Sequence, residues 1–108
     1  MNKETNKFQA NFIPKDPWSM YTYALNEIKG RWIKGEPIIA KDAWWSFRYA
    51  LDVIKGRFIK GESIIAKDAR YAYEYALYII KGRWIKGEKV ILNSEYKNKY
   101  KKLLILSN

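Results

Sequence analysis

Apolar residues recur along this chain with a period of 26 residues. Segments 15–40, 41–66 and 67–92 align without a gap, and each opens with Lys-Asp. Within a segment the apolar residues fall at i, i+3, i+4 and i+7, which predicts an amphipathic helix. The stripe consists of Tyr21, Ala24, Leu25 and Ile28, then Phe47, Ala50, Leu51 and Ile54, then Tyr73, Ala76, Leu77 and Ile80. We therefore expect three copies of one helical unit, stacked because no unit can bury its apolar face alone.

Each stripe lies between residues that favour helix ends. The preceding residue that suits an N-cap is Asp16, Asp42 or Asp68, and Pro17 suits a first helical position. The glycine that follows is Gly30, Gly56 or Gly82. We expect each helix to end there with that glycine in the left-handed conformation.

A second, shorter apolar segment follows in each unit, as in IKGEPIIAK at 33–41. It predicts a second helix of about two turns, with Gly35 and Pro37 in or near the first turn. The expected fold is all-α, a short α-solenoid of 26-residue helix-turn-helix repeats within a single domain, 1–108.

The ends of the array are predicted to be incomplete. Residues 1–11 are expected to form a flexible N-terminus, and 12–14, within FIPKD, resemble the end of a preceding unit. Segment 93–108 is a degenerate fourth copy with Ser94 at the cap position, and it is predicted to be a C-terminal cap helix. An ungapped alignment places Lys99 and Lys102 where earlier units carry apolar residues, as suits a terminal repeat with a solvated face.

Composition narrows the function. The chain has no cysteine or histidine, so disulfides, thiolate metal sites and the commonest general base are absent. We expect no enzyme activity, no cofactor and no metal site. With no apolar run long enough to span a membrane and no signal-like N-terminus, we expect a cytoplasmic protein with no membrane partner. The net charge of +10 predicts a polyanionic partner.

The repeat itself supplies much of that charge. The recurring cations are Lys15, Lys41 and Lys67 before the caps, Lys29, Lys55 and Lys81, Arg31, Arg57 and Arg83, and Lys34, Lys60 and Lys86. Stacking would align them in a ladder along one edge, at roughly 10 Å per unit. The lysines at 29, 55 and 81 could also complement the helix dipole. For the arginines two interpretations stay open: a brace to Glu36, Glu62 and Glu88, or a contact surface for a ligand.

The aromatic residues divide into two groups. Trp32, Phe58 and Trp84 are expected to wedge between units, and Tyr23, Tyr49 and Tyr75 to line a second buried face. Helical geometry predicts that the variable residues Trp45, Arg48, Arg70, Tyr71 and Tyr78 project away from the apolar stripe. Aromatic rings interleaved with cations suit RNA, where bases stack and phosphates need positive charge.

The unit resembles tandem motifs of the type KDxxxAYxYAxxVIKGRWxxGE in uncharacterised bacteriophage proteins. The most specific part is YA, then IKGRW or IKGRF, then GE, and the similarity covers about 15–92. Ile-Lys here replaces the Pro-Glu pair of many such proteins, for example at 33–34. The resemblance implies a small phage accessory protein and, by analogy, an inhibitor of a host defence system, a class that includes anti-CRISPR proteins.

Two functions follow as hypotheses. The first is a non-catalytic basic repeat protein that binds nucleic acid, RNA in preference to duplex DNA, in a host defence complex of the infected bacterium. Its binding residues would be the lysine and arginine ladder with Trp45, Arg48, Arg70, Tyr71 and Tyr78. The second is a protein-binding solenoid that docks an acidic host protein. The open first half-repeat also leaves room for an oligomer.

Overall fold

The computed structural model of the chain describes residues 16–107. Within this range helices are the only regular secondary structure, which confirms the all-α class. The α-helices are α2 (Pro17–Tyr23), α3 (Glu36–Ile39), α4 (Ala43–Arg48), α5 (Glu62–Ile65), α6 (Ala69–Tyr75), α7 (Ile85–Leu92) and α8 (Lys97–Leu106). The expected flexible segment 1–11 and the half-repeat 12–14 lie outside the described residues.

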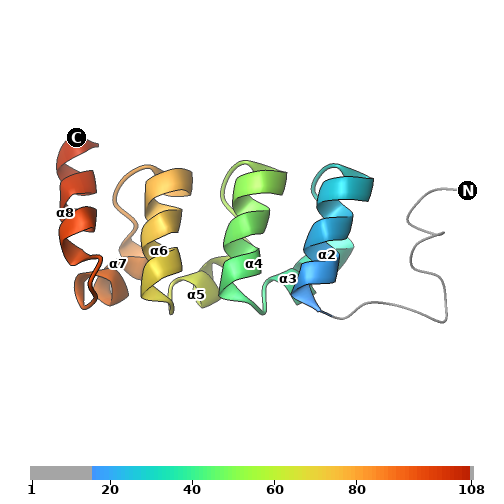
Figure 1. The fold of residues 1–108 in the computed structure, drawn as a ribbon, viewed down its shortest axis with the longest axis horizontal. Helices are drawn as coiled ribbons and strands as arrows, with labels where there is room; N and C mark the ends of the chain where they lie inside the picture. The colour runs from blue at the N-terminus through green and yellow to red at the C-terminus, as the bar shows by residue number, and fades with distance from the viewer. Residues whose placement is uncertain (1–15, 108) are drawn as a thin grey trace, which may run out of the picture.

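Helices α2, α4, α6 and α8 stand side by side in a row, and the short helices α3, α5 and α7 lie between them near the level where the long helices begin (Figure 1). Helix α2 packs against α3 and α4, and α4 packs against α5 and α6. The same succession of a long helix and a short helix therefore occurs in each of the segments 15–40, 41–66 and 67–92, as far as the structure describes them.

The predicted N-caps of the three repeats are confirmed, whereas Ser94 is not the N-cap of α8, which begins after Tyr96. The Asp16 carboxylate accepts a hydrogen bond from the Ser19 N–H at 2.8 Å, and Asp42 accepts one from the Trp45 N–H at 2.8 Å. Asp68 caps α6 in the same way. The predicted second helix is also present: a 3-10 turn, Ile33–Gly35, leads into α3, and Ile59–Gly61 leads into α5.

The prediction that glycine takes the left-handed conformation at the helix end is wrong. The left-handed residues are Lys29, Lys55 and Lys81, with φ of 60°, 60° and 63°, and no glycine among the described residues has positive φ. Helices α2, α4 and α6 each continue into a π-helical segment: Ala24–Ile28, Tyr49–Ile54 and Ala76–Ile80. One carbonyl, such as that of Ala24, then accepts hydrogen bonds from the N–H groups of both the lysine and the following glycine. The lysine, and not the glycine after it, is therefore the residue at which the chain reverses.

The rings that were predicted to wedge between units, Trp32, Phe58 and Trp84, contact Tyr23, Tyr49 and Tyr75 of their own units, and each is seated on a glycine three residues later. The pairs are Trp32 with Gly35, Phe58 with Gly61 and Trp84 with Gly87. A Cβ on Gly61 would lie 2.6 Å from the Phe58 ring and 2.8 Å from the Ser46 Cβ. Since these are impossible contacts, the glycine is required for close packing rather than for a turn.

The fourth unit is shifted by one residue relative to the ungapped alignment. The Tyr100 hydroxyl contacts Glu88, 12 residues earlier, whereas Tyr75 contacts a glutamate 13 residues earlier. With Tyr100 equivalent to Tyr75, Lys99 and Lys102 do not replace the apolar residues that the ungapped alignment assigned to them. The predicted polar outer face is nevertheless present, because the α8 residues Lys97, Lys99, Lys101 and Lys102 are all exposed.

Candidate nucleic-acid interface

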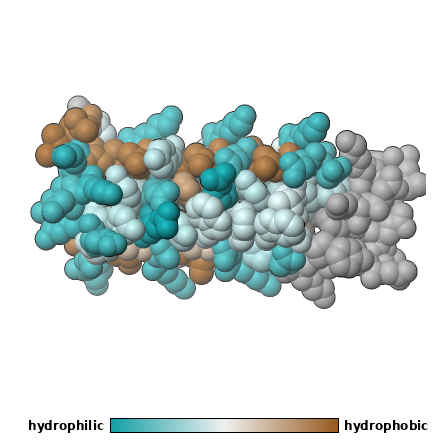
Figure 2. Space-filling model, in the orientation of Figure 1, coloured by the Kyte–Doolittle hydropathy of each residue, from teal (hydrophilic) through white to brown (hydrophobic). Residues whose placement is uncertain are grey.

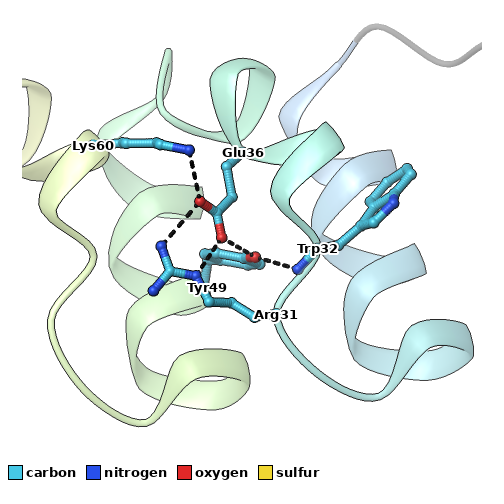
Figure 3. Close-up of polar contacts among 5 residues, drawn as sticks. All are labelled: Arg31, Trp32, Glu36, Tyr49 and Lys60. Carbon is cyan, nitrogen blue, oxygen red and sulfur yellow. Dashed lines mark hydrogen bonds and ion pairs between the residues drawn. The ribbon is translucent and has the colours of Figure 1, made fainter.

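A buried glutamate forms the centre of the contact between neighbouring units (Figure 3). Glu36 is completely buried, and its carboxylate accepts two hydrogen bonds from the Arg31 guanidinium, at 2.7 and 3.1 Å. The Tyr49 hydroxyl of the next unit donates to Glu36 at 2.7 Å and accepts from the Trp32 N–H at 2.8 Å. Lys60, also from the next unit, approaches the same carboxylate at 3.2 Å. Each partner thus satisfies a group that would otherwise be buried without a hydrogen bond.

The network recurs at the following two junctions. Glu62 binds Arg57 and the Tyr75 hydroxyl, which accepts from the Phe58 N–H. Glu88 binds Arg83 and the Tyr100 hydroxyl, which accepts from the Trp84 N–H. This arrangement answers the question that the sequence left open for the arginine column. Arg31, Arg57 and Arg83 brace the fold, although their side chains stay 47%, 52% and 61% exposed.

The network holds the glutamates ionised. Burial raises the pKa of Glu36 and Glu62, but hydrogen bonds from the arginine and the tyrosine outweigh it, so both pKa values lie below the usual 4.5. The hydrogen bonds from Arg83 lower the pKa of Glu88 in the same direction. Burial, followed by the bond to Glu88, raises the pKa of Tyr100 to about 12. The tyrosine therefore stays neutral and keeps donating at physiological pH.

These shifts predict acid lability. A carboxylate whose pKa is lower in the folded state stabilises the fold fully above its pKa in the unfolded chain, about 4.5. This stabilisation is lost as the pH falls through the pKa that the carboxylate has in the folded state. We expect the free energy of unfolding, measured by urea denaturation, to decline steeply below about pH 4.5. The variant Glu62→Gln should show a shallower decline because one of the three linked groups is gone; an unchanged slope would contradict this account.

All five arginines are engaged in ion pairs with carboxylates of the protein. In addition to the three arginines of the network, Arg48 pairs with Asp52 at 2.7 Å and Arg70 with Glu74 at 2.9 Å, each one turn along its helix. The guanidinium of Arg48 lies over the Trp44 ring and that of Arg70 over the Tyr71 ring. Excess positive charge at the surface is therefore carried mainly by lysines.

The lysines differ from the arginines because most of them form no ion pair in the described part of the chain. Within 16–107, Lys60 is the lysine that forms an ion pair, and the ladder lysines Lys29, Lys34, Lys41, Lys55, Lys67, Lys81 and Lys86 are exposed. Lys29, Lys55 and Lys81 end the three long helices, and hydrophilic side chains project along the edge where these helices end (Figure 2). Lys41 and Lys67 precede the N-caps at the opposite edge, so the predicted single ladder is divided between two edges.

The predicted projection of Trp45 and Tyr71 into solvent is wrong. Trp45 is half-buried against Tyr21, with ring centroids 5.0 Å apart. Tyr71 is half-buried between Trp44, at 5.3 Å, and Phe47, at 6.4 Å. Neighbouring units supply these rings, so a helix face that looks free in one isolated unit is covered in the array.

Tyr78, also predicted, is 50% exposed, although its ring contacts Phe47. Trp18, which the sequence interpretation did not single out, is 56% exposed. These two rings are the large aromatic surfaces open to solvent among the described residues.

The sequence interpretation also missed the role of tyrosine in the buried network. Tyr49 and Tyr75 were expected to line a buried face, which they do, but not to hydrogen-bond a glutamate of the preceding unit. A signal was present: in both units a tyrosine follows the recurring glutamate by 13 residues. Only the folded structure shows that this spacing brings the two side chains together.

Comparisons with known proteins add no functional information, since no family model, curated protein or solved structure matches the chain. Over 16–107, no group of acidic side chains is arranged to hold a metal ion. In the same range no helix is long and apolar enough to cross a membrane.

Proposed function

We propose that the protein is a short α-solenoid that binds RNA in preference to duplex DNA, through phosphates and without catalysis. The solenoid assignment is supported by the three junctions at which a buried glutamate of one unit meets a tyrosine of the next. The binding assignment is supported by exposed lysines that form no ion pair with the protein's own carboxylates.

The main support for the proposal is the lysine in the left-handed conformation at the end of each of the helices that begin as α2, α4 and α6. A left-handed residue with a Cβ costs about 1 kcal/mol or more relative to glycine. The chain has a glycine available at the next position, yet it places lysine at the strained one three times: Lys29, Lys55 and Lys81. Their side chains end in solvent and form no ion pair. Because backbone strain that local structure does not require is often retained for function, we assign these lysines to ligand binding.

The mode of binding follows from which cations are free. Arginine reads bases through its two-pronged guanidinium, and all five guanidinium groups are already paired with carboxylates. Lysine contributes a point charge that attracts phosphate without reading sequence. Exposed rings at Trp18 and Tyr78 can stack on unpaired bases, which favours RNA with single-stranded loops over duplex DNA.

The biological setting is the part of the proposal that rests on resemblance alone. The similarity of the IKGRW unit to phage proteins supports a phage inhibitor of a host defence system, such as CRISPR, that acts in the bacterial cytoplasm on RNA or on a complex containing RNA.

The test replaces Lys29, Lys55 and Lys81 together with glycine. We expect the triple variant to be more stable, by about 1 kcal/mol per site, because glycine relieves the left-handed strain. We expect it to bind a fluorescein-labelled RNA stem-loop more weakly in anisotropy titrations. The slope of log affinity against log salt concentration should fall by about 2, which corresponds to three phosphate contacts.

The matched control is the triple variant Lys97→Ala, Lys101→Ala and Lys102→Ala, which removes the same charge from α8. It should bind the stem-loop almost as well as the parent protein. Equal weakening by both triple variants would mean that net charge alone attracts RNA. A stabilised glycine variant with unchanged affinity and salt slope would refute the proposal.

A further inference from the structure

Three isoleucines at one position of the repeat are exposed to solvent. Ile33, Ile59 and Ile85 begin the second helical segment of successive units and are 56%, 60% and 70% exposed. Most other large apolar side chains between 16 and 107 are buried or half-buried. These three isoleucines are exposed at the same position of successive units, and we call them the isoleucine column.

The fold does not explain why all three of these positions are occupied by isoleucine. In the same short helices, the exposed position four residues later is occupied by Pro37, Ser63 and Lys89 in successive units. That position varies freely, as expected where a side chain contacts only water. The column does not vary, although isoleucine is the costlier residue to leave in water. A requirement outside the fold explains an invariant apolar residue at an exposed position.

The surroundings of the column are positively charged. Each isoleucine is followed by a lysine, Lys34, Lys60 or Lys86, all exposed. The guanidinium of the same unit is about half exposed, as with Arg57 at 52%. The arginine of each unit is paired with its own glutamate and Lys60 approaches Glu36 at 3.2 Å, so Lys34 and Lys86 carry the unpaired charge beside the column. The column is therefore an apolar strip with cationic neighbours.

We propose that the isoleucine column binds an extended acidic polypeptide segment that carries an apolar side chain at every third residue. Units packed at roughly 10 Å match one turn of a polyproline II helix, three residues at about 3.1 Å each, which returns every third side chain to the same face. Apolar side chains of the segment would contact Ile33, Ile59 and Ile85 in turn. Carboxylates between them would meet Lys34 and Lys86, whereas Lys60 is already paired with Glu36. RNA is a poorer occupant, because isoleucine offers no flat ring on which a base can stack.

The probe is a fluorescein-labelled peptide made of four Leu-Glu-Asp triplets, titrated with the full chain in anisotropy measurements. We expect saturable binding to the parent protein. The triple variant Ile33→Ser, Ile59→Ser and Ile85→Ser should bind at least tenfold more weakly. Its thermal midpoint should match that of the parent, since the replaced side chains lie in solvent.

Two controls define the result. The double variant Ile105→Ser and Leu106→Ser removes exposed apolar residues from α8, at 73% and 78% exposure, and should bind the peptide like the parent protein. A peptide of the same composition with its leucines grouped at one end should bind at least tenfold more weakly than the triplet peptide.

Failure of the parent protein to bind the triplet peptide overturns the proposal, as does equal binding of the serine variant or of the grouped peptide. Loss of binding to anionic phosphatidylserine vesicles by the serine variant, with no binding of the peptide, would assign the column to a membrane surface instead. The inference does not rest on the proposed RNA function. The serine variant should bind the RNA stem-loop like the parent protein, so the two proposals can fail separately.

Discussion

Replacing Tyr75 with phenylalanine is expected to lower the free energy of unfolding by about 3 kcal/mol, although it removes one oxygen atom from the core. The Tyr75 hydroxyl donates to Glu62 at 2.7 Å and accepts from the Phe58 N–H at 3.0 Å. All three residues are buried. The variant would leave a buried N–H without an acceptor and deprive a buried carboxylate of one donor, while the ring keeps its packing. Urea denaturation at neutral pH measures the loss.

The control is Tyr78→Phe, the same chemical change three residues later, in the π-helical segment Ala76–Ile80 that continues α6. Tyr78 is 50% exposed, so water can replace any partner of its hydroxyl, and we expect a change within about 0.5 kcal/mol. If the two variants lose similar amounts, the network is not what joins the units. The junction would then be held by apolar packing alone.

The second large effect is expected at Gly61. Its replacement by alanine should also cost about 3 kcal/mol, at the upper end of overpacking effects in well-filled cores. The new Cβ would lie 2.6 Å from the Phe58 ring, and Ser46 Cβ blocks it at 2.8 Å on another side. Phe58 is itself fully buried and has no space into which it can retreat. Thermal and urea denaturation of the purified variant provide the measurement.

Gly56→Ala in the same unit is the matched control. The nearest atom to a Cβ there, outside its chain neighbours, is Ile54 Cγ2 at 3.8 Å, an ordinary contact, and its φ is not positive. We expect this variant to be as stable as the parent or more stable by up to about 1 kcal/mol. If Gly61→Ala lowered the free energy of unfolding no more than Gly56→Ala does, the Phe58 ring would be able to move aside.

Much of the fold could be predicted because its signals are local. The caps at Asp16, Asp42 and Asp68 act on an N–H three residues ahead, and the apolar stripe depends only on helical periodicity. The second helix follows for the same reason. The left-handed position was placed one residue late because the standard rule assigns it to glycine, and nothing local indicates the π-helical end at which Lys29 takes that conformation instead.

The candidate binding surface was harder to predict, because exposure is a property of the assembled units. Trp45 and Tyr71 look solvent-facing on a single helix but are covered by rings of neighbouring units. Ile59 looks like a core residue by type but is 60% exposed, because Phe58 and Gly61 on either side take the buried positions. Helical periodicity in the first case, and residue type in the second, predicts the wrong exposure.

By itself, then, the sequence determined the helical units, the N-caps of the three repeats and the excess of positive charge. These follow from periodicity, short-range hydrogen bonds and composition. The tertiary structure decided which charged side chains form ion pairs within the protein. Contact between units buries Glu36, Glu62 and, to a lesser extent, Glu88, and their ionisation requires an arginine and a tyrosine beside each. The arginines are thereby bound to the fold, and the lysines and the isoleucine column are left free at the surface.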